Sequence, residues 1–203
     1  MDSETPKRSL DEIRADIDSV DSELIHLLEK RVQLAREVGL VKGVSNKPYF
    51  TPERERQVYE RLSLSASGLL NAQQITSIFR EIISAARSAE KPMQIAYWGP
   101  EGTFSHMAAV QAFGRSVELQ PVYNIREVFL AVERGQADYG VVPIENSIAG
   151  VVPETLDVFP HTDVKIVSET FLDVNHHLGS TADSLDQIER VYAGPQPAAQ
   201  CRQ

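Results

Sequence analysis

The sequence has little that suits an oxidising compartment, a membrane or a nucleic acid. A single cysteine, Cys201, stands among 203 residues, so no internal disulfide can form and a cytoplasmic location is expected. The apolar runs are far shorter than the ~20 residues of a membrane-spanning helix, and the N-terminal segment is charged where a secretory signal would be apolar. Acidic residues outnumber basic ones by 29 to 20, and the net charge of −9 argues against a nucleic-acid partner.

The remaining composition is that of a globular protein. Hydrophobic residues make up 42% and charged residues 24% of the chain, and its length allows one or two domains. The hydrophobic periodicity changes near Pro92, where a helical pattern gives way to alternating strands and helices. We therefore expect an all-α domain over residues 1–91 and an α/β domain over residues 92–203.

The helical domain begins with an unusually long helix. Apolar positions recur every three or four residues from Leu10 to Lys42, and Gly39 costs about 1 kcal/mol relative to alanine without ending the helix. Such a helix is about 50 Å long, whereas a small domain is about 30 Å across. Since one copy of a 90-residue unit cannot cover this stripe, we expect a homodimer of interleaved helices.

Two further helices are predicted from their first turns. Thr51 supplies an N-cap hydroxyl and Pro52 suits the first helical position, which predicts a helix to about Leu64. Asn71 and Gln74 form a capping-box pattern that opens a third helix, running to Glu90.

The second half alternates strands and helices, which predicts a parallel α/β sheet. Pro143 lacks an N–H group, so the strand that contains it should end there or lie at an edge. The predicted strands are residues 94–98, 117–122, 139–144, 164–168 and 171–174, and the predicted helices are residues 105–113, 124–131 and 153–158.

Polar side chains follow two of these strands. The carboxyl ends of strands in an α/β sheet are where ligands bind, so these side chains should line a small-molecule cleft. They supply hydroxyls, an amide and a carboxylate, and they are Thr103, Ser105, Glu145, Asn146 and Ser147.

Three blocks carry a family resemblance. Residues 97–106 (YWGPEGTFSH), 140–147 (GVVPIENS) and 155–157 (TLD) resemble the prephenate dehydratase signature in order and spacing, and the segment before residue 92 resembles the helical chorismate mutase domain that bacteria fuse to it. The chain thus resembles the bifunctional chorismate mutase–prephenate dehydratases of phenylalanine biosynthesis. The resemblance implies a two-lobed dehydratase domain like a periplasmic binding protein, here truncated within lobe two, without the later threonine–arginine–phenylalanine motif and regulatory domain.

The resemblance implies a mutase site for chorismate, a dicarboxylate, inside the helical bundle. Arg31 and Arg54 match substrate-binding arginines, Lys42 matches the lysine on the ether oxygen, Glu55 matches the carboxylate that holds the substrate hydroxyl, and Arg14 matches an arginine that reaches the partner's site. The rearrangement needs the substrate folded and charge stabilised at the breaking C–O bond. From the residues alone, Arg31 and Lys42 could instead be structural cations on one helix face.

Three positions depart from the best-known pattern of the family. Thr51 stands where an aspartate assists Glu55, and Ala86 stands where a serine binds a carboxylate. Glu90 replaces a glutamine that donates to the ether oxygen, and a carboxyl group donates only when it is protonated. We therefore predict a mutase whose activity depends on pH; as a structural alternative, Glu90 pairs with cations of the first helix.

The resemblance also implies a site for prephenate, which loses carbon dioxide and water. The residues after the two strands match its lobe-one contacts, and Gln200 matches a lobe-two glutamine. Ala193 and Gly194 replace the usual serine and histidine of that lobe. Thr155 is interpreted as structural, the histidines form no metal cluster, and neither a metal nor an organic cofactor is expected.

Two other functions stay open from the sequence. One is a mutase with an inactive dehydratase remnant. The other is a ligand-binding sensor whose helical segment serves for dimerisation. The long uninterrupted first helix argues against a helix-turn-helix, which needs a tight turn between short helices.

Overall fold

The computed structural model describes residues 8–44, 50–65, 68–148, 150–194, 197, 198 and 201, with the backbone alone at residues 42–44. The chain divides into two compact units. Unit 1 contains residues 1–95 and 110–119, and unit 2 contains residues 96–109 and 120–203. Within the described ranges, no helix is long and apolar enough to cross a membrane.

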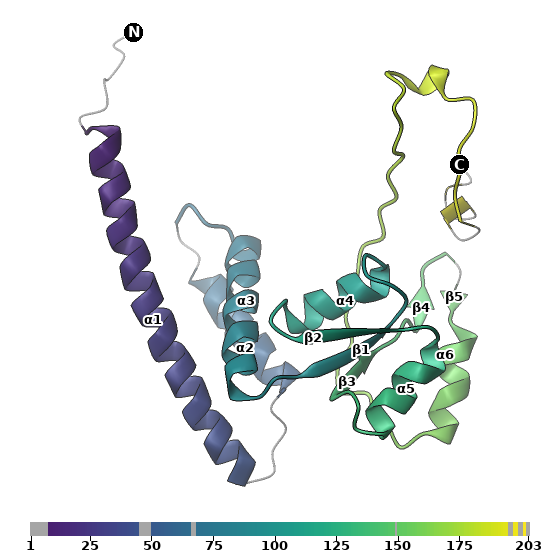
Figure 1. The fold of residues 1–203 in the computed structure, drawn as a ribbon, viewed down its shortest axis with the longest axis horizontal. Coiled ribbons are helices and arrows are strands. Elements are labelled where there is room, and N and C mark those ends of the chain that lie inside the picture. Colours follow the sequence, from purple (N-terminus) through teal and green to yellow (C-terminus); the bar gives the residue numbers. More distant parts are fainter. Residues whose placement is uncertain are drawn as a thin grey trace. The chain divides into compact units, whose positions relative to one another are not determined.

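Three helices dominate unit 1 (Figure 1). They are α1 (Leu10–Val44), α2 (Pro52–Leu64) and α3 (Ala72–Glu90), and α3 packs against both of the others. The predicted all-helical first half is confirmed. Gly39 lies inside α1 and does not end it, as its modest helical cost predicts.

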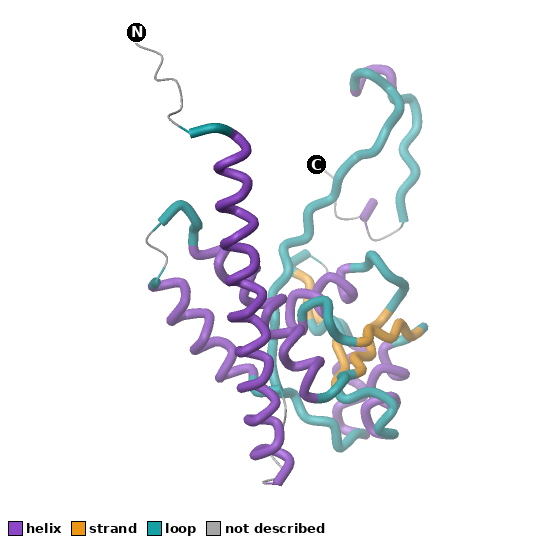
Figure 2. The backbone as a smooth tube through the Cα atoms, turned by 60° about the vertical axis from the view of Figure 1, so that its left-hand side comes forward, coloured by secondary structure: helices purple, strands orange, loops and turns teal. Residues whose placement is uncertain are grey.

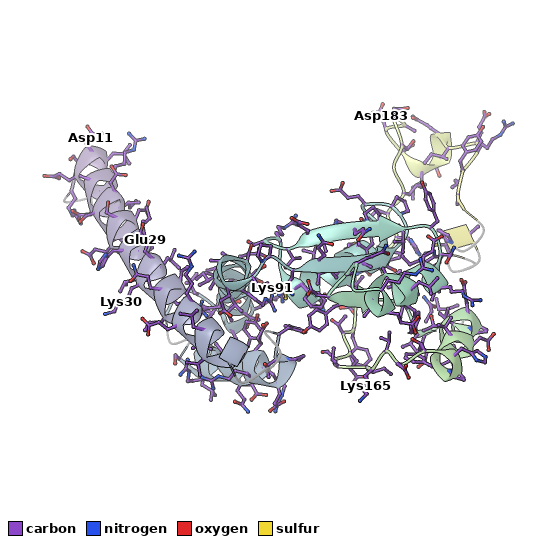
Figure 3. All side chains as sticks on the ribbon, turned by 60° about the horizontal axis from the view of Figure 1, so that its bottom comes forward. Asp11, Glu29, Lys30, Lys91, Lys165 and Asp183 are labelled. Atoms are coloured by element: carbon purple, nitrogen blue, oxygen red, sulfur yellow. The ribbon has the colours of Figure 1, made fainter. Side chains whose placement is uncertain are left out.

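Most of α1 is uncovered in a single copy of the chain. Every residue from Leu10 to Lys30 is exposed, and the side chains along this stretch stand out from the helix, as Asp11, Glu29 and Lys30 show in Figure 3. Partial burial begins at Arg31. The exposed apolar side chains of this stretch are Leu10, Ile13, Ile17, Val20, Leu24, Ile25, Leu27 and Leu28.

The two predicted helix caps differ in outcome. Asn71 Oδ1 accepts from Gln74 N, and Gln74 Oε1 accepts from Asn71 N, both at 2.9 Å, which confirms the capping box. Thr51 is the N-cap residue of α2, but its hydroxyl makes no capping hydrogen bond. Its ψ of 89° differs from the 167° of Asn71, so the side chain is not aimed at the first turn. The predicted hydroxyl cap at Thr51 is wrong.

Unit 1 also takes in the end of α4 (Phe104–Phe113) and the start of β2 (Glu118–Val122). Ser84 Oγ donates to the Phe113 carbonyl at 2.8 Å and accepts from Ser116 N at 3.1 Å. Gly114 has φ +75°, and a Cβ there would lie 2.4 Å from Ser84 Cβ. Helix α3 and this turn therefore fit together only with glycine at position 114.

A small parallel sheet has the strand order β2-β1-β3, where β1 is Gln94–Trp98 and β3 is Tyr139–Val141. Helix α5 (Ile125–Glu133) lies in the chain between β2 and β3, and Asn124 caps it through Glu127 N at 2.9 Å. The core beside α5 contains Ala96, Val128, Ala131 and Ala137, with Val122, Val132 and Val142 packed against it.

The chain after β3 departs from the predicted elements. The strand expected over residues 139–144 ends at Val141, so Pro143 lies beyond it, as the missing N–H of proline predicts. A short antiparallel hairpin, β4 (Glu145–Asn146) and β5 (Gly150–Val151), follows and was not predicted. Helix α6 (Pro153–Val158) is found as predicted and continues into η1 (Phe159–His161).

The strands predicted over residues 164–168 and 171–174 are wrong. These residues run as loop (Figure 2), and η2 (Leu185–Gln187) is a single short turn further on. Ile166 and Phe171 are exposed, at 67% and 82%. A strand needs a neighbour for its backbone groups, and the described part of the chain pairs no strand with these residues.

Candidate functional site

A cavity of about 110 Å³ opens among the three helices of unit 1. Its lining combines cations, carboxylates and a small apolar floor. It contains every expected mutase residue except Arg14 and Lys42. The lining residues are Arg31, Ala35, Thr51, Arg54, Glu55, Ile83, Ala86, Arg87 and Glu90.

The two remaining mutase residues stand differently. Arg14 is exposed and lies 3.7 Å from Asp11 in an exposed ion pair. It precedes Arg31 by 17 residues, which is about 25 Å along a helix, so it does not reach the cavity of its own chain. Lys42 lies in α1, but its side chain is outside the described residues.

Arg31 places a cation on the inner side of α1. Its side chain is partly buried, and Nη1 donates to the Ile82 carbonyl at 3.5 Å. Burial lowers the pKa of the Arg31 guanidinium, while Tyr59 and the carboxylates of Glu55 and Glu90 act in the opposite direction. An arginine with a lowered pKa is still protonated near neutral pH, so Arg31 gives the cavity a fixed positive charge.

Glu55 is bound by an arginine that sequence reasoning missed. Arg87 Nη1 donates to Glu55 Oε1 at 2.6 Å, and the two side chains are only 6% and 15% exposed. Helical spacing could have identified Arg87, because it lies four residues after Ile83 and three before Glu90, on the same face of α3. The periodicity was visible, but the partner on α2 was not.

Tyr59 supplies a second, weaker contact to Glu55. Its hydroxyl donates to Glu55 Oε2 at 3.4 Å. The pKa of Tyr59 is raised to about 12, mainly by burial and also by the charge of Glu55, against the opposing effect of Arg87 and Arg80. The phenol is therefore neutral, and remains a donor, across any ordinary assay range.

The charges of the cavity suit an anion. Three arginines line it, against the two carboxylates of Glu55 and Glu90, and Glu55 is paired with Arg87. Arg54 is exposed and makes only a long contact, 3.5 Å from Nη1 to Gln57 Oε1. Ala86 offers a methyl group in place of a donor. No set of three His, Cys, Asp or Glu side chains in the described ranges is placed to hold a metal.

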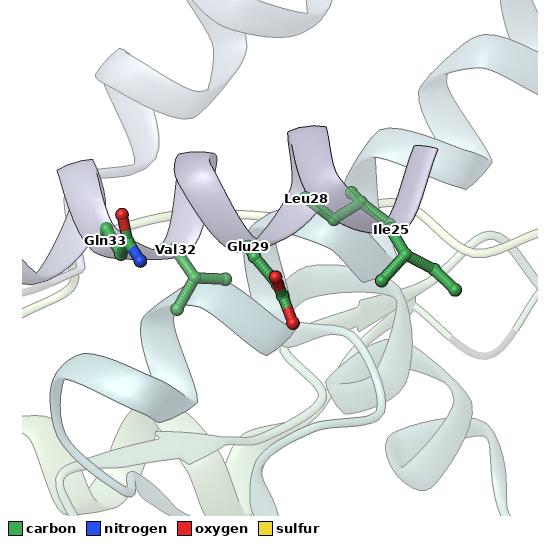
Figure 4. Close-up of a pocket in the computed structure, with 5 residues that line it drawn as sticks. All are labelled: Ile25, Leu28, Glu29, Val32 and Gln33. Carbon is green, nitrogen blue, oxygen red and sulfur yellow. The ribbon is translucent and has the colours of Figure 1, made fainter. Parts of the chain in front are cut away.

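A larger depression, of about 510 Å³, lies on α1 (Figure 4). Its lining comes from one helix alone, so it is an open face rather than an enclosed site. It holds a single carboxylate among mainly apolar groups, which makes it a poor candidate for chemistry. The lining residues are Ile25, Leu28, Glu29, Val32 and Gln33.

In unit 2, the hydroxyl of Thr103 is used locally. Oγ1 donates to the Pro100 carbonyl at 2.9 Å and accepts from His106 N at 3.3 Å, so Thr103 closes the turn that starts α4. Ser105 is partly buried in the first turn of the same helix. His106 packs its ring on Tyr97, with centroids 5.2 Å apart.

Glu145, Asn146 and Ser147 form the first side of the β4–β5 hairpin and its turn. Asn146 Oδ1 accepts from Ile148 N at 2.9 Å, which shapes that turn, while Glu145 and Ser147 are exposed. The buried Thr155 donates from Oγ1 to the Pro143 carbonyl at 2.6 Å and so fixes the chain before Glu145. Thr155 is structural, as predicted, but its partner lies outside its own helix.

The expected small-molecule cleft around these unit 2 residues stays a prediction. Gln200, expected to contact substrate from lobe two, lies outside the described residues.

The chain belongs to the prephenate dehydratase family, whose family model matches residues 95–203. Residues 13–91 match the family model of chorismate mutase type II. The two matches meet close to Pro92, where the periodicity of the sequence changes, and they agree with a helical domain followed by an α/β domain.

Relatives that combine the two domains are named bifunctional chorismate mutase/prephenate dehydratase. The relative from Aquifex aeolicus (strain VF5) is 45% identical over 197 residues, which cover 95% of this chain and 54% of that protein. The relative from Stutzerimonas stutzeri is 41% identical (94% and 54% covered), and that from Escherichia coli (strain K12) is 37% identical (99% and 56%). The chain thus spans about half the length of the curated relatives it matches.

The X-ray structure of prephenate dehydratase from Streptococcus mutans aligns with 34% of this chain and 36% of that chain, at 48% identity and a TM-score of 0.33.

Proposed function

We propose that the chain is a chorismate mutase and prephenate dehydratase of L-phenylalanine biosynthesis, acting in the cytoplasm, with the mutase in residues 1–91 and the dehydratase in residues 92–203. The observation that carries the mutase assignment is the cavity of unit 1. It brings Arg31, Arg54, Glu55 and Glu90 together inside the stretch that matches chorismate mutase type II.

The mutase step is a Claisen rearrangement, which transfers no proton and needs no nucleophile. Arg31 and Arg54 would bind the two carboxylates of chorismate and select the folded, chair-like conformer. Lys42 and protonated Glu90 would donate to the ether oxygen, where negative charge develops as the C–O bond breaks. Glu55, which also accepts from Arg87 and Tyr59, would accept from the substrate hydroxyl.

A homodimer through α1 is part of the proposal. The eight exposed aliphatic side chains between Leu10 and Leu28 are roughly half accessible, and covering them would stabilise a dimer by on the order of 8 kcal/mol per copy. The open depression of Figure 4 begins on this stretch, at Ile25 and Leu28, and extends along α1 to Gln33. In such a dimer, Arg14 of one chain would complete the cavity of the other.

Mixing two inactive variants tests the mutase and the dimer together. Arg14→Ala and Arg31→Ala should each lose most mutase activity alone. Unfolding and refolding them together should restore about a quarter of the wild-type rate, because half of the dimers pair unlike chains and each of these has one intact site. No recovery in a mixture that light scattering shows to be dimeric would contradict a shared site.

The dehydratase half would act on prephenate. The ring carboxylate leaves as carbon dioxide, its electrons form the aromatic ring, and the hydroxyl leaves as water with a proton from an acid. The residues that would bind the substrate are Thr103, Ser105, Glu145, Asn146, Ser147 and Gln200. Assaying the two reactions separately on the purified chain tests this half, and mutase turnover without dehydratase turnover would restrict the proposal to the mutase.

A further inference from the structure

The side chain of Arg87 is buried and makes several contacts besides its ion pair with Glu55. Its side chain is 6% exposed, Nη1 donates to Glu55 Oε1 at 2.6 Å, and Nη2 donates to the Phe113 carbonyl at 2.7 Å. The guanidinium carbon lies 4.9 Å from the ring centre of Phe50 and 5.9 Å from that of Phe113. These two hydrogen bonds and the two aromatic rings fix the position of the guanidinium group.

The partner of Arg87 explains why that position matters. Both groups line the cavity, and Glu55 is the carboxylate proposed to accept from the substrate hydroxyl. A second contact of Glu55, from Tyr59, is long and comes from its own helix α2. Arg87 is therefore a short, charged contact through which α3 fixes Oε1 of Glu55 at the cavity wall.

The Phe113 carbonyl ties this pair to a distant part of the sequence. Phe113 lies in the stretch that matches prephenate dehydratase, although the turn after it packs within unit 1. The same carbonyl accepts from Ser84 Oγ, one turn before Arg87 on α3. Ser116 N donates to Ser84 Oγ, and Arg115 N donates to Glu81 Oε2 at 3.1 Å, which adds two more hydrogen bonds between α3 and this turn.

We propose that Arg87 is a positioning residue of the mutase site, which orients Glu55 toward the substrate and is itself held by the Phe113 carbonyl. Mutase activity would then depend on a turn of the dehydratase-matching stretch that contains no substrate contact. The proposal rests on the mutase function proposed above.

A pH profile separates positioning from simple structural support. Arg87→Met removes the cation that favours the charged form of Glu55, so Glu55 should hold its proton to higher pH. The acid side of the mutase profile should move to higher pH, and kcat near neutrality should fall about tenfold, the value of one strong charged hydrogen bond. Arg87→Lys keeps the charge, so it should retain the position of the acid side.

Among the described side chains, the other charged or titratable groups that line the cavity or act on Tyr59 are unchanged in these variants: Arg31, Arg54, Tyr59, Arg80 and Glu90. Arg36→Met is the matched control, because Arg36 also donates to a carbonyl of α3, that of Ala89, but is exposed and does not line the cavity. It should leave the profile unchanged. If Arg87→Met lowers mutase activity but the acid side of its pH profile stays where it is in wild type, Arg87 has only a structural role.

An NMR titration of the Glu55 carboxyl decides the point without turnover. Its pKa should be higher in Arg87→Met than in wild type, and equal values would overturn the proposal. If the wild-type chain does not rearrange chorismate, the proposed function fails while this measurement still stands. The two failures are therefore distinguishable.

The Phe113 contact has its own test. Gly114→Ala should push the turn away from Ser84 and lower kcat in the direction of Arg87→Met. Gly135→Ala is the control for backbone strain, since Gly135 also has positive φ, +66°, but nothing lies within 4 Å of the added Cβ. A folded Gly114→Ala chain with wild-type activity would remove Phe113 from the proposal. If Gly114→Ala does not fold, a scalar coupling between Arg87 Nη2 and the Phe113 carbonyl carbon in the wild-type chain decides, and its absence overturns the contact.

Discussion

Gly39 of α1 lies directly against the carboxylate of Glu90 on α3. A Cβ built at Gly39 would lie 3.3 Å from Glu90 Oε2 and 3.4 Å from its Cγ, which is closer than most such contacts. Gly39 is itself buried. The glycine therefore has a packing role at the cavity wall, beyond the cost that it adds to the helix.

Gly39→Ala should separate stability from catalysis. Alanine favours the helix by about 1 kcal/mol, and Glu90 can yield a few tenths of an ångström because its carboxyl is the end of a flexible side chain. We expect α1 to be as stable as wild type or more so by thermal unfolding, and mutase kcat to fall because the Glu90 donor is displaced. Unchanged kcat would mean that Glu90 does not act on the substrate from this position.

Mutase activity should decline as pH rises. In the proposed mechanism Glu90 donates to the ether oxygen, and a carboxyl group donates only while protonated, so the donor is lost toward alkaline pH. Glu90→Gln keeps a donor at every pH and should flatten the profile of kcat against pH while retaining or raising the rate near neutrality. A variant profile with the same slope as wild type would assign Glu90 to a structural pairing instead.

Lys42→Ala should lower the mutase rate by roughly 10²-fold or more, because removing a preorganised donor from a developing oxyanion costs ~3 kcal/mol. The dimer should persist by light scattering. Measurement of kcat under saturating chorismate is the direct check. A loss of less than about tenfold would mean that the cation supports structure rather than the reaction.

Tyr59 should make the helical unit sensitive to strong alkali. Its pKa is raised from 10.0 to about 12, so its folded environment favours the neutral phenol. That contribution to stability is complete below about pH 10 and is lost as pH rises toward about pH 12. In Tyr59→Phe, the free energy of unfolding, followed by helical circular dichroism, should fall less steeply across this window. Equal slopes in the two proteins would argue against the shift.

Thr155 should stabilise unit 2 through its hydroxyl. Thr155→Val keeps the shape but leaves the Pro143 carbonyl without this donor, at a cost of about 1–3 kcal/mol. Thr155→Ser keeps the bond and loses only a methyl group, so it should cost about 1 kcal/mol. Denaturant unfolding followed by the fluorescence of Trp98, the single tryptophan, reports on this unit. A valine variant more stable than the serine variant would contradict the role of the bond.

Structural features that depend on residues close together in the sequence could be predicted. The spacing of apolar positions predicted α1 and α3, and the reciprocal pair of Asn71 and Gln74 predicted a cap that the structure confirms. Thr51 carried a similar local signal, yet its hydroxyl makes no capping hydrogen bond to α2, where the backbone ψ is 89°. The type of the capping residue therefore predicts where a helix starts better than it predicts a capping hydrogen bond.

Features that depend on a distant partner were not predictable. The apolar residues of 164–168 and 171–174 have strand composition, but a strand forms only where another strand accepts its backbone bonds. Arg87 shows the same limit at the site. The sequence indicated the face of α3 on which Arg87 lies. It did not indicate the two partners of Arg87, which are Glu55 on α2 and the Phe113 carbonyl, 26 residues after Arg87.

The bond from Arg87 to Phe113 bears on how such a two-enzyme chain can be divided. A gene fragment that ends after Lys91 would encode all three helices but not the carbonyl that accepts from Arg87 and Ser84. In its product the Arg87 guanidinium would lack the carbonyl to which it donates, and Phe50 would lose its contact with the Phe113 ring. A cut after Ser116 would retain all of these contacts. The boundary at which the reading frame can be split without loss is therefore set by hydrogen bonds of α3, and it lies beyond the point where the sequence changes its periodicity.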